Sequence, residues 1–136
     1  AGVSTAINAL LPATQTLTVE PTGYDDHARS FTQGSRATNT DPKPSICDAL
    51  LAPEPGEHTF EVNRETIKRG LVVTDEQVRG AIRFAFTELK MVVEPGGAAT
   101  LAAVLNTHEF ENQTVAIVLS GGNIDPKLFA NILGET

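Results

Sequence analysis

The stretch from position 114 to 126 constrains the fold most strongly. Residues 114–119 carry no charge and four of them are branched aliphatics, a pattern typical of a strand buried on both faces. The two glycines in residues 120–123 let the backbone turn sharply and approach a ligand closely, and Asp125 can cap a helix that follows. Strand, glycine turn and helix place a ligand at the carboxyl end of a strand in an open α/β sheet. Ser120 is therefore a candidate functional residue, and the alternative is a tight connection without further role.

Short helical and strand patterns alternate along the rest of the chain. The most regular helix begins at the capping box Thr74–Gln77 and carries an apolar stripe as far as Leu89. This alternation predicts an α/β class with a parallel sheet, and 136 residues suffice for one domain with one core. The other expected helices cover residues 1–11, 25–33, 58–67, 98–105 and 128–133, and the other expected strands cover residues 16–19 and 71–73.

Composition excludes several classes of protein. A net charge of -7 without any basic run argues against nucleic acid or an anionic membrane surface as the main partner. No apolar run approaches the length of a transmembrane helix. Cys47 is the only cysteine, so a disulfide framework within the monomer is impossible, and a reducing compartment such as the cytoplasm is expected. The chain opens on a helical pattern without an initial Met, which suggests a processed or excised piece.

Two acids lie six residues apart across a turn that contains Gly23. An irregular turn can aim the carboxylates of Glu20 and Asp26, with a main-chain carbonyl, at one point, and hard cations such as Mg²⁺ or Ca²⁺ prefer such all-oxygen sites. The alternative is two solvated acids, with Asp25 or Asp26 capping the next helix.

Three other residues have two interpretations each. Asp48 lies in an apolar run, where a carboxylate must be paired or cap a backbone turn, and capping is favoured. Glu94 precedes Pro95 and a glycine pair, so it either favours a helix start or lines the same crevice as Ser120. Cys47 is expected to be a small core residue, and the three histidines are expected to be exposed or satisfied locally.

The segments 92–98 and 115–125 together resemble the C-terminal part of the serine/threonine dehydratase family. The pairing of Glu-Pro-Gly-Gly-Ala with a later Ser-Gly-Gly-Asn carries the resemblance, which covers essentially the whole chain. These enzymes use pyridoxal phosphate on fold type II, as does the β chain of tryptophan synthase. The resemblance implies that residues 1–136 are the C-terminal part of the large cofactor-binding domain. It also implies that Ser120 donates a hydrogen bond to the pyridine nitrogen of the cofactor, with Gly121, Asn123 and Glu94 beside it.

The same resemblance assigns roles to two earlier segments. Glu20, the Tyr24 main-chain carbonyl and Asp26 match the divalent-cation site of the serine racemase and hydroxyaspartate dehydratase branch. Residues 46–49 resemble a family segment beside the cofactor, with Cys in place of Ala and Ala in place of Gly. Asp48 and Ala49 are therefore further candidate cofactor contacts.

Two features of the family have no counterpart in this sequence. The Schiff-base lysine lies far upstream in the family, and the phosphate-binding loop lies just before the point where this chain opens. None of the four lysines, at positions 43, 68, 90 and 127, lies in the matching context. We therefore expect the chain alone to be catalytically silent and to need the N-terminal half of the enzyme.

The resemblance implies a parent enzyme that eliminates water from a β-hydroxy amino acid to give a 2-oxo acid and ammonia. Threonine and serine are the expected substrates, with hydroxyaspartate elimination or serine racemisation as alternatives within the family, and a homodimer as the assembly. The alternative from another class is a non-catalytic fragment that binds a divalent cation or self-associates through exposed apolar faces.

Overall fold

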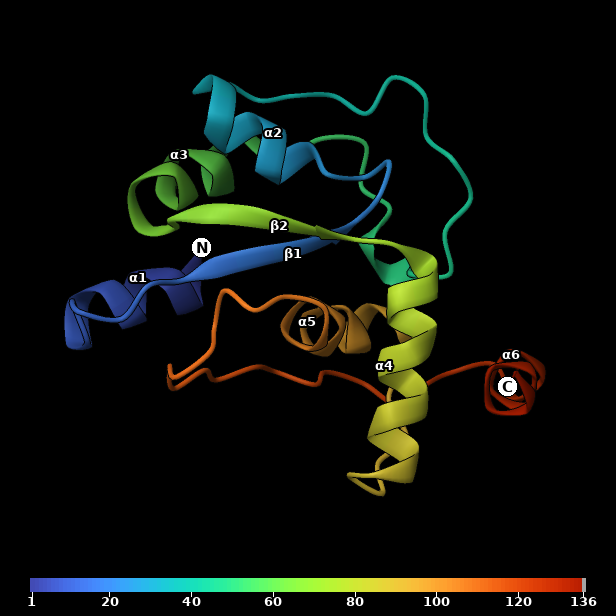
Figure 1. Ribbon diagram of the computed structural model, residues 1–136. Helices are drawn as coiled ribbons and strands as arrows, with labels where there is room; N and C mark the ends of the chain where they lie inside the picture. The colour runs from blue at the N-terminus through green and yellow to red at the C-terminus, as the bar shows by residue number, and fades with distance from the viewer. Residues whose placement is uncertain (136) are drawn as a thin grey trace. The chain divides into compact units, whose positions relative to one another are not determined.

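A computed structural model describes residues 1–135 of the chain. The helices are α1 (Gly2–Leu10), α2 (Asp26–Gln33), α3 (Glu57–Thr66), α4 (Asp75–Thr87), α5 (Pro95–Leu105) and α6 (Pro126–Gly134), with a short 3₁₀ helix, η1 (Asp48–Leu50). The strands β1 (Leu17–Pro21) and β2 (Arg69–Val73) pair in one parallel sheet. The α/β class is thus confirmed (Figure 1). The chain divides into two compact units, residues 1–44 with 51–72 and residues 45–50 with 73–136.

The first unit is built around the two strands, which run in the same direction (Figure 1). The Lys68 amide donates to the Thr16 carbonyl at 2.9 Å, immediately before each strand begins. A turn with Gly23 at φ 87° leads from β1 into α2, and Gly34 ends α2 in the left-handed conformation expected of a helix C-terminus. The turn after β1 therefore brings the start of α2 back to the end of that strand.

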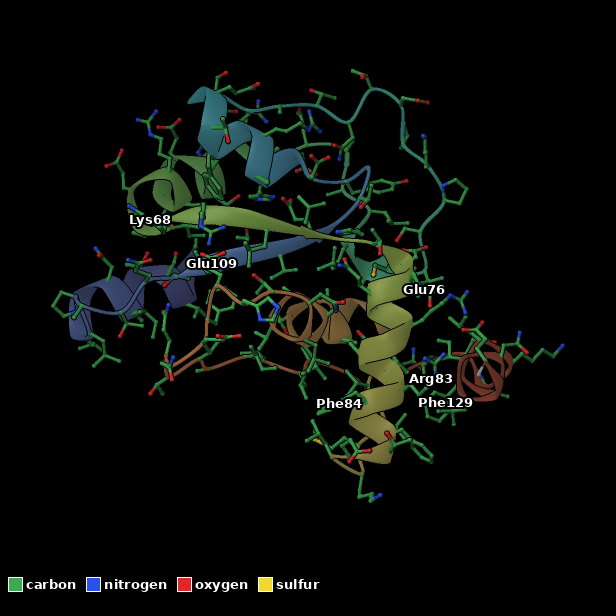
Figure 2. The ribbon with its side chains drawn as sticks, viewed as in Figure 1. Lys68, Glu76, Arg83, Phe84, Glu109 and Phe129 are labelled. Atoms are coloured by element: carbon green, nitrogen blue, oxygen red, sulfur yellow. The ribbon has the colours of Figure 1, made fainter. Side chains whose placement is uncertain are left out.

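The second unit is helical. The Thr74–Gln77 capping box is present, and the side chains of Val78, Ala81, Ile82 and Ala85 on α4 are buried. Helix α4 packs on α5, whose small residues are buried along almost its whole length. Helix α6 begins at the Asp125 cap and packs on α4, and Figure 2 shows Arg83 and Phe129 between these two helices. The Arg83 Nε donates to the Ile132 carbonyl at 3.2 Å.

The segment 115–119 departs from its predicted structure. It forms no strand, and Ala116 and Val118 are exposed. Within residues 1–135 the only sheet consists of β1 and β2, so no strand pairs with this segment. A buried strand needs a hydrogen-bonded neighbour as well as an apolar sequence, and the prediction of a buried strand is wrong for the described chain.

The apolar face of α1 is also exposed. The helix forms where the periodicity predicts it, but Val3 is 74% and Leu10 is 78% exposed. The buried residue is Ser4, whose hydroxyl accepts a hydrogen bond from the Thr66 hydroxyl at 2.8 Å. Among the described residues, polar contacts with α3 hold α1 in place. None of the helices in residues 1–135 is both long and apolar enough to cross a membrane.

Candidate functional site

The glycine turn at residues 120–123 is held directly against the start of α5. The Glu94 amide donates to the Gly121 carbonyl at 3.1 Å, and the Asn123 amide donates to Glu94 Oε2 at 3.2 Å. A methyl group added at Gly97 would lie 2.0 Å from the Ser120 carbonyl oxygen. The backbone of the turn therefore passes closer to α5 than any side chain at position 97 permits.

Ser120 is exposed at this turn, and no other residue in the described part of the chain forms a hydrogen bond with its hydroxyl. Gly121 follows with φ 76°, a conformation that side chains disfavour. A methyl group at Gly121 would also lie 2.4 Å from the carboxyl carbon of Glu94. The two glycines and Glu94 thus fix the turn, and the Ser120 hydroxyl remains available to a ligand.

Glu94 and Ala49 approach the same end of α5. Glu94 is the N-cap residue, but its side chain makes no capping bond and binds the glycine turn instead. The Cβ of Ala49 would lie 3.4 Å from a methyl group added at Gly96. The structure thus brings Glu94, Ala49 and the glycine turn to the start of one helix.

The capping role expected of Asp48 is not supported. Its side chain is exposed, and no hydrogen bond to another described residue accounts for it. The turn before it is held by Asp75, which accepts the Ser45 hydroxyl at 2.6 Å and the Ile46 amide at 3.0 Å. Cys47 is buried as expected, and burial raises the pKa of its thiol to about 11.

A second group of polar residues lies where β1 leads into α2, in the first unit. The Glu20 carboxylate accepts the amides of His27 at 3.0 Å and Ala28 at 2.9 Å. It satisfies two of the free amides at the start of α2. The alternative interpretation, in which Asp25 or Asp26 caps the helix, is not supported, because the Asp25 side chain makes no capping bond.

Asp26 is buried and only partly satisfied. Its Oδ1 accepts the Asn39 side-chain amide at 2.7 Å, whereas its buried Oδ2 has no hydrogen-bond donor. Burial raises the pKa of this carboxyl, and the nearby charge of Glu20 raises it further. An uncompensated carboxylate oxygen in such a place costs folding energy and is suited to a cation.

His27 completes the cluster. Its Nδ1 lies 2.9 Å from Glu20 Oε1 and 3.4 Å from Asp26 Oδ2. Donor atoms of the three side chains lie within 4.8 Å of one another. The hydrogen bond to Glu20 raises the pKa of His27 and outweighs the opposing effect of burial.

Sequence reasoning left His27 and Asn39 out of this cluster. His27 was expected to be satisfied locally, and its contact with Glu20 agrees with that expectation. The position of His27 directly after Asp26 in the sequence is the one feature that could have indicated a place near the expected cation ligands. Asn39 lies in the long polar loop and has no sequence signal, because its amide reaches Asp26 only through the fold. The remaining expected ligand, Tyr24, lies in the intervening turn, where its amide donates to the Pro21 carbonyl at 3.0 Å.

Residues 1–121 match the family model described as pyridoxal-phosphate dependent enzyme. The chain therefore belongs to the family of pyridoxal-phosphate dependent enzymes.

Individual relatives support this assignment. The chain is 37% identical to a phenylserine dehydratase of Ralstonia pickettii over 136 residues, which are 98% of this chain and 41% of that protein. It is 34% identical to an L-threonine ammonia-lyase of Thermotoga maritima over 134 residues, covering 98% of this chain and 33% of the relative. Among solved structures, maize serine racemase superposes with a TM-score of 0.85 and 34% identity, over 96% of this chain and 41% of that one. The chain thus spans between a third and about two fifths of the length of these three relatives.

Proposed function

We propose that this chain is the C-terminal part of the large domain of a pyridoxal-phosphate dependent ammonia-lyase. In the parent enzyme, water is eliminated from a β-hydroxy amino acid, and a 2-oxo acid and ammonia are released. Relatives named as dehydratases and ammonia-lyases support this reaction class, while relatives named as serine racemases keep racemisation as the alternative. A cytoplasmic homodimer with a small amino-acid substrate is part of the proposal.

The observation that carries the proposal is the exposed Ser120 hydroxyl on a turn fixed by Glu94. The donor set fits the cofactor, because a neutral hydroxyl can donate to a pyridine nitrogen without holding it protonated as a carboxylate would. When bound, the cofactor withdraws electrons from the substrate α-carbon. Ser120 orients the ring, and the Gly121 and Asn123 backbone keeps the hydroxyl in place through Glu94. Asp48 and Ala49 supply further contacts next to α5.

The test is Ser120→Ala in the complete enzyme, with Ser35→Ala as the control at another exposed serine. Loss of a hydrogen bond that orients the ring should lower kcat roughly tenfold, equivalent to about 1.4 kcal/mol. The cofactor absorption spectrum should also shift in the Ser120 variant alone. Equal rates and spectra for both variants would contradict the role of Ser120. The described chain without its N-terminal half should neither form a Schiff-base absorption band nor turn over threonine.

We further propose that Glu20 and Asp26, with the Tyr24 carbonyl, hold a divalent cation such as Mg²⁺ or Ca²⁺. The buried Asp26 Oδ2 without a hydrogen-bond donor supports this site, and Asn39 orients the carboxylate from the other side. The test is titration calorimetry with Ca²⁺ on Asp26→Ala and on the neighbouring control Asp25→Ala. Binding should be lost in the first variant only, and unchanged binding in both would remove Asp26 as a ligand.

A non-catalytic role is the second candidate. The exposed apolar residues of α1 favour self-association of the chain when nothing else covers them. A chain of this kind would bind the cation and associate, but adding its N-terminal half would restore no activity.

A further inference from the structure

We propose that His27 is an additional ligand of the cation site, and that its imidazole makes the site prefer borderline transition ions such as Co²⁺ or Zn²⁺ over Mg²⁺ and Ca²⁺. This inference rests on the cation site proposed above and concerns its chemical selectivity. Oxygen ligands alone suit hard cations, whereas an imidazole nitrogen favours later transition ions.

The geometry of the three side chains carries the inference. With metal–ligand bonds of about 2.1 Å, neighbouring donor atoms around a tetrahedral or octahedral ion lie about 3.0 to 3.4 Å apart. The His27 Nδ1 lies 2.9 Å from Glu20 Oε1 and 3.4 Å from Asp26 Oδ2. All three donor atoms lie within 4.8 Å of one another. The two distances from His27 Nδ1 therefore match the spacing of neighbouring ligands around one ion.

Each donor is held in place from outside the cluster. The amides at the start of α2 fix Glu20, and Asn39 fixes Asp26 through Oδ1. Oδ2 then faces the cluster, buried and without a hydrogen-bond donor. Asn39 is itself held, because its side-chain amide also donates to the Ala52 carbonyl at 2.9 Å. Such support around the ligands is what sets the orientation and affinity of a metal site.

The imidazole of His27 is also restrained. It is only partly exposed, and its ring lies 6.1 Å from that of Phe31, one turn further along α2. The ring therefore presents Nδ1 to the two carboxylates. By contrast, the side chain of His108 is 96% exposed and contacts Glu111. His108 thus provides a matched histidine outside the cluster.

The experiment compares Co²⁺ and Ca²⁺ binding by calorimetry in the wild-type chain and in His27→Asn. An Asn side chain keeps a hydrogen-bonding group near Glu20. It lacks the imidazole nitrogen, and its amide offers only a hard oxygen as a ligand. We expect Co²⁺ affinity to fall by at least about tenfold and Ca²⁺ affinity to change by less than about threefold. The control His108→Ala should change neither affinity. Circular dichroism verifies that each variant is folded.

A second readout uses the wild-type chain alone, so it does not depend on the folding of any variant. Added Co²⁺ should shift and broaden the imidazole NMR resonances of His27 at equimolar metal, while those of His108 stay unchanged. If both ions bind through Asp26 but His27→Asn changes both affinities equally or not at all, the inference fails and the cation site stands. If Asp26→Ala abolishes the binding of neither ion, or if neither ion binds at all, the cation site and the inference fail together.

Discussion

Two carboxylates six residues apart have different roles because their surroundings differ. The Glu20 oxygens are satisfied by backbone amides and by His27, so this residue stabilises the start of α2 with or without a cation. Asp26 has one oxygen bound by Asn39 and one buried without a donor. The free energy cost of that second oxygen is the physical reason to expect a cation, since buried polar groups in folded proteins are almost always paired.

Asp26→Asn should stabilise the cation-free chain and remove its response to cations. Because the pKa of Asp26 is raised, the charged form is disfavoured in the folded state, and a neutral amide removes that cost at pH 7. We expect the free energy of unfolding to rise by about 1 kcal/mol, measured by urea unfolding with and without Ca²⁺. Asp25→Asn should leave the cation response intact. A variant that is less stable than wild type without cations would contradict this account of Asp26.

Cys47 should be inert in the folded chain. Its side chain is fully buried, and with a pKa near the raised value of about 11 it stays a thiol at pH 8. A thiol reagent such as Ellman's should therefore react slowly, at the rate at which the structure opens, and at once when urea is added. Immediate reaction without urea would show that the segment around Cys47 is open in solution.

The elements of the chain could be predicted where the deciding contacts are local. The Thr74 capping box and the Asp125 cap need only a few neighbouring residues, and both form as expected. Helix α5 begins at Pro95, three residues before the predicted start, because Pro is well suited to a first helical position. Segment 115–119 shows the opposite case. Its apolar pattern predicts a strand, but a strand also requires a partner that the described residues do not provide.

In the candidate site, too, local features could be predicted from the sequence, whereas contacts between distant segments could not. The exposed position of Ser120 on a glycine turn follows from the order of residues 120–123. The use of the Glu94 side chain to bind that turn depends on how α5 meets it, which the sequence left open between two interpretations. The contact of Asn39 with Asp26 joins a loop to a helix, and no local sequence pattern predicts it.

The close packing of the α5 backbone against the glycine turn predicts that a side chain at Gly97 destabilises the chain, whereas one at Gly80 does not. Gly97→Ala would place its methyl group 2.0 Å from the Ser120 carbonyl oxygen, so the turn must move. We expect a loss of roughly 1–3 kcal/mol in the free energy of unfolding. Gly80→Ala on α4 meets nothing within 4 Å and should instead stabilise the chain by up to about 1 kcal/mol. Chemical unfolding of both variants checks this, and similar stabilities would contradict the packing described here.

On the scale of the whole molecule, the chain leaves apolar surface exposed that its sequence pattern predicts to be buried. Val3, Leu10 and Leu11 on and after α1 are each more than half exposed. Helical periodicity correctly predicts which residues share a face, but it cannot tell what covers that face.

Leu10→Lys should therefore reduce self-association of the isolated chain. Leu10 is 78% exposed, so a charge there costs little folding energy and disrupts an apolar contact between copies. Sedimentation velocity over a range of concentrations would measure the effect. The control Val62→Lys alters a hydrophobic residue on α3 that is 38% exposed and should leave association unchanged. Monomeric behaviour of the wild-type chain at all concentrations would remove the α1 face as an association surface.

The division into two compact units predicts that cation binding acts on one of them. Glu20, Asp26 and His27 all belong to the unit formed by residues 1–44 and 51–72, and the Ser120 turn belongs to the other. A ligand stabilises what it contacts through mass action, and units with separate cores open separately. Ca²⁺ or Co²⁺ should therefore slow amide hydrogen exchange in β1 and α2 while exchange in α4 and α5 stays unchanged. Asp26→Ala should abolish the slowing. Equal protection of both units would mean that they unfold as one, in which case cation binding would also stabilise the turn that presents Ser120.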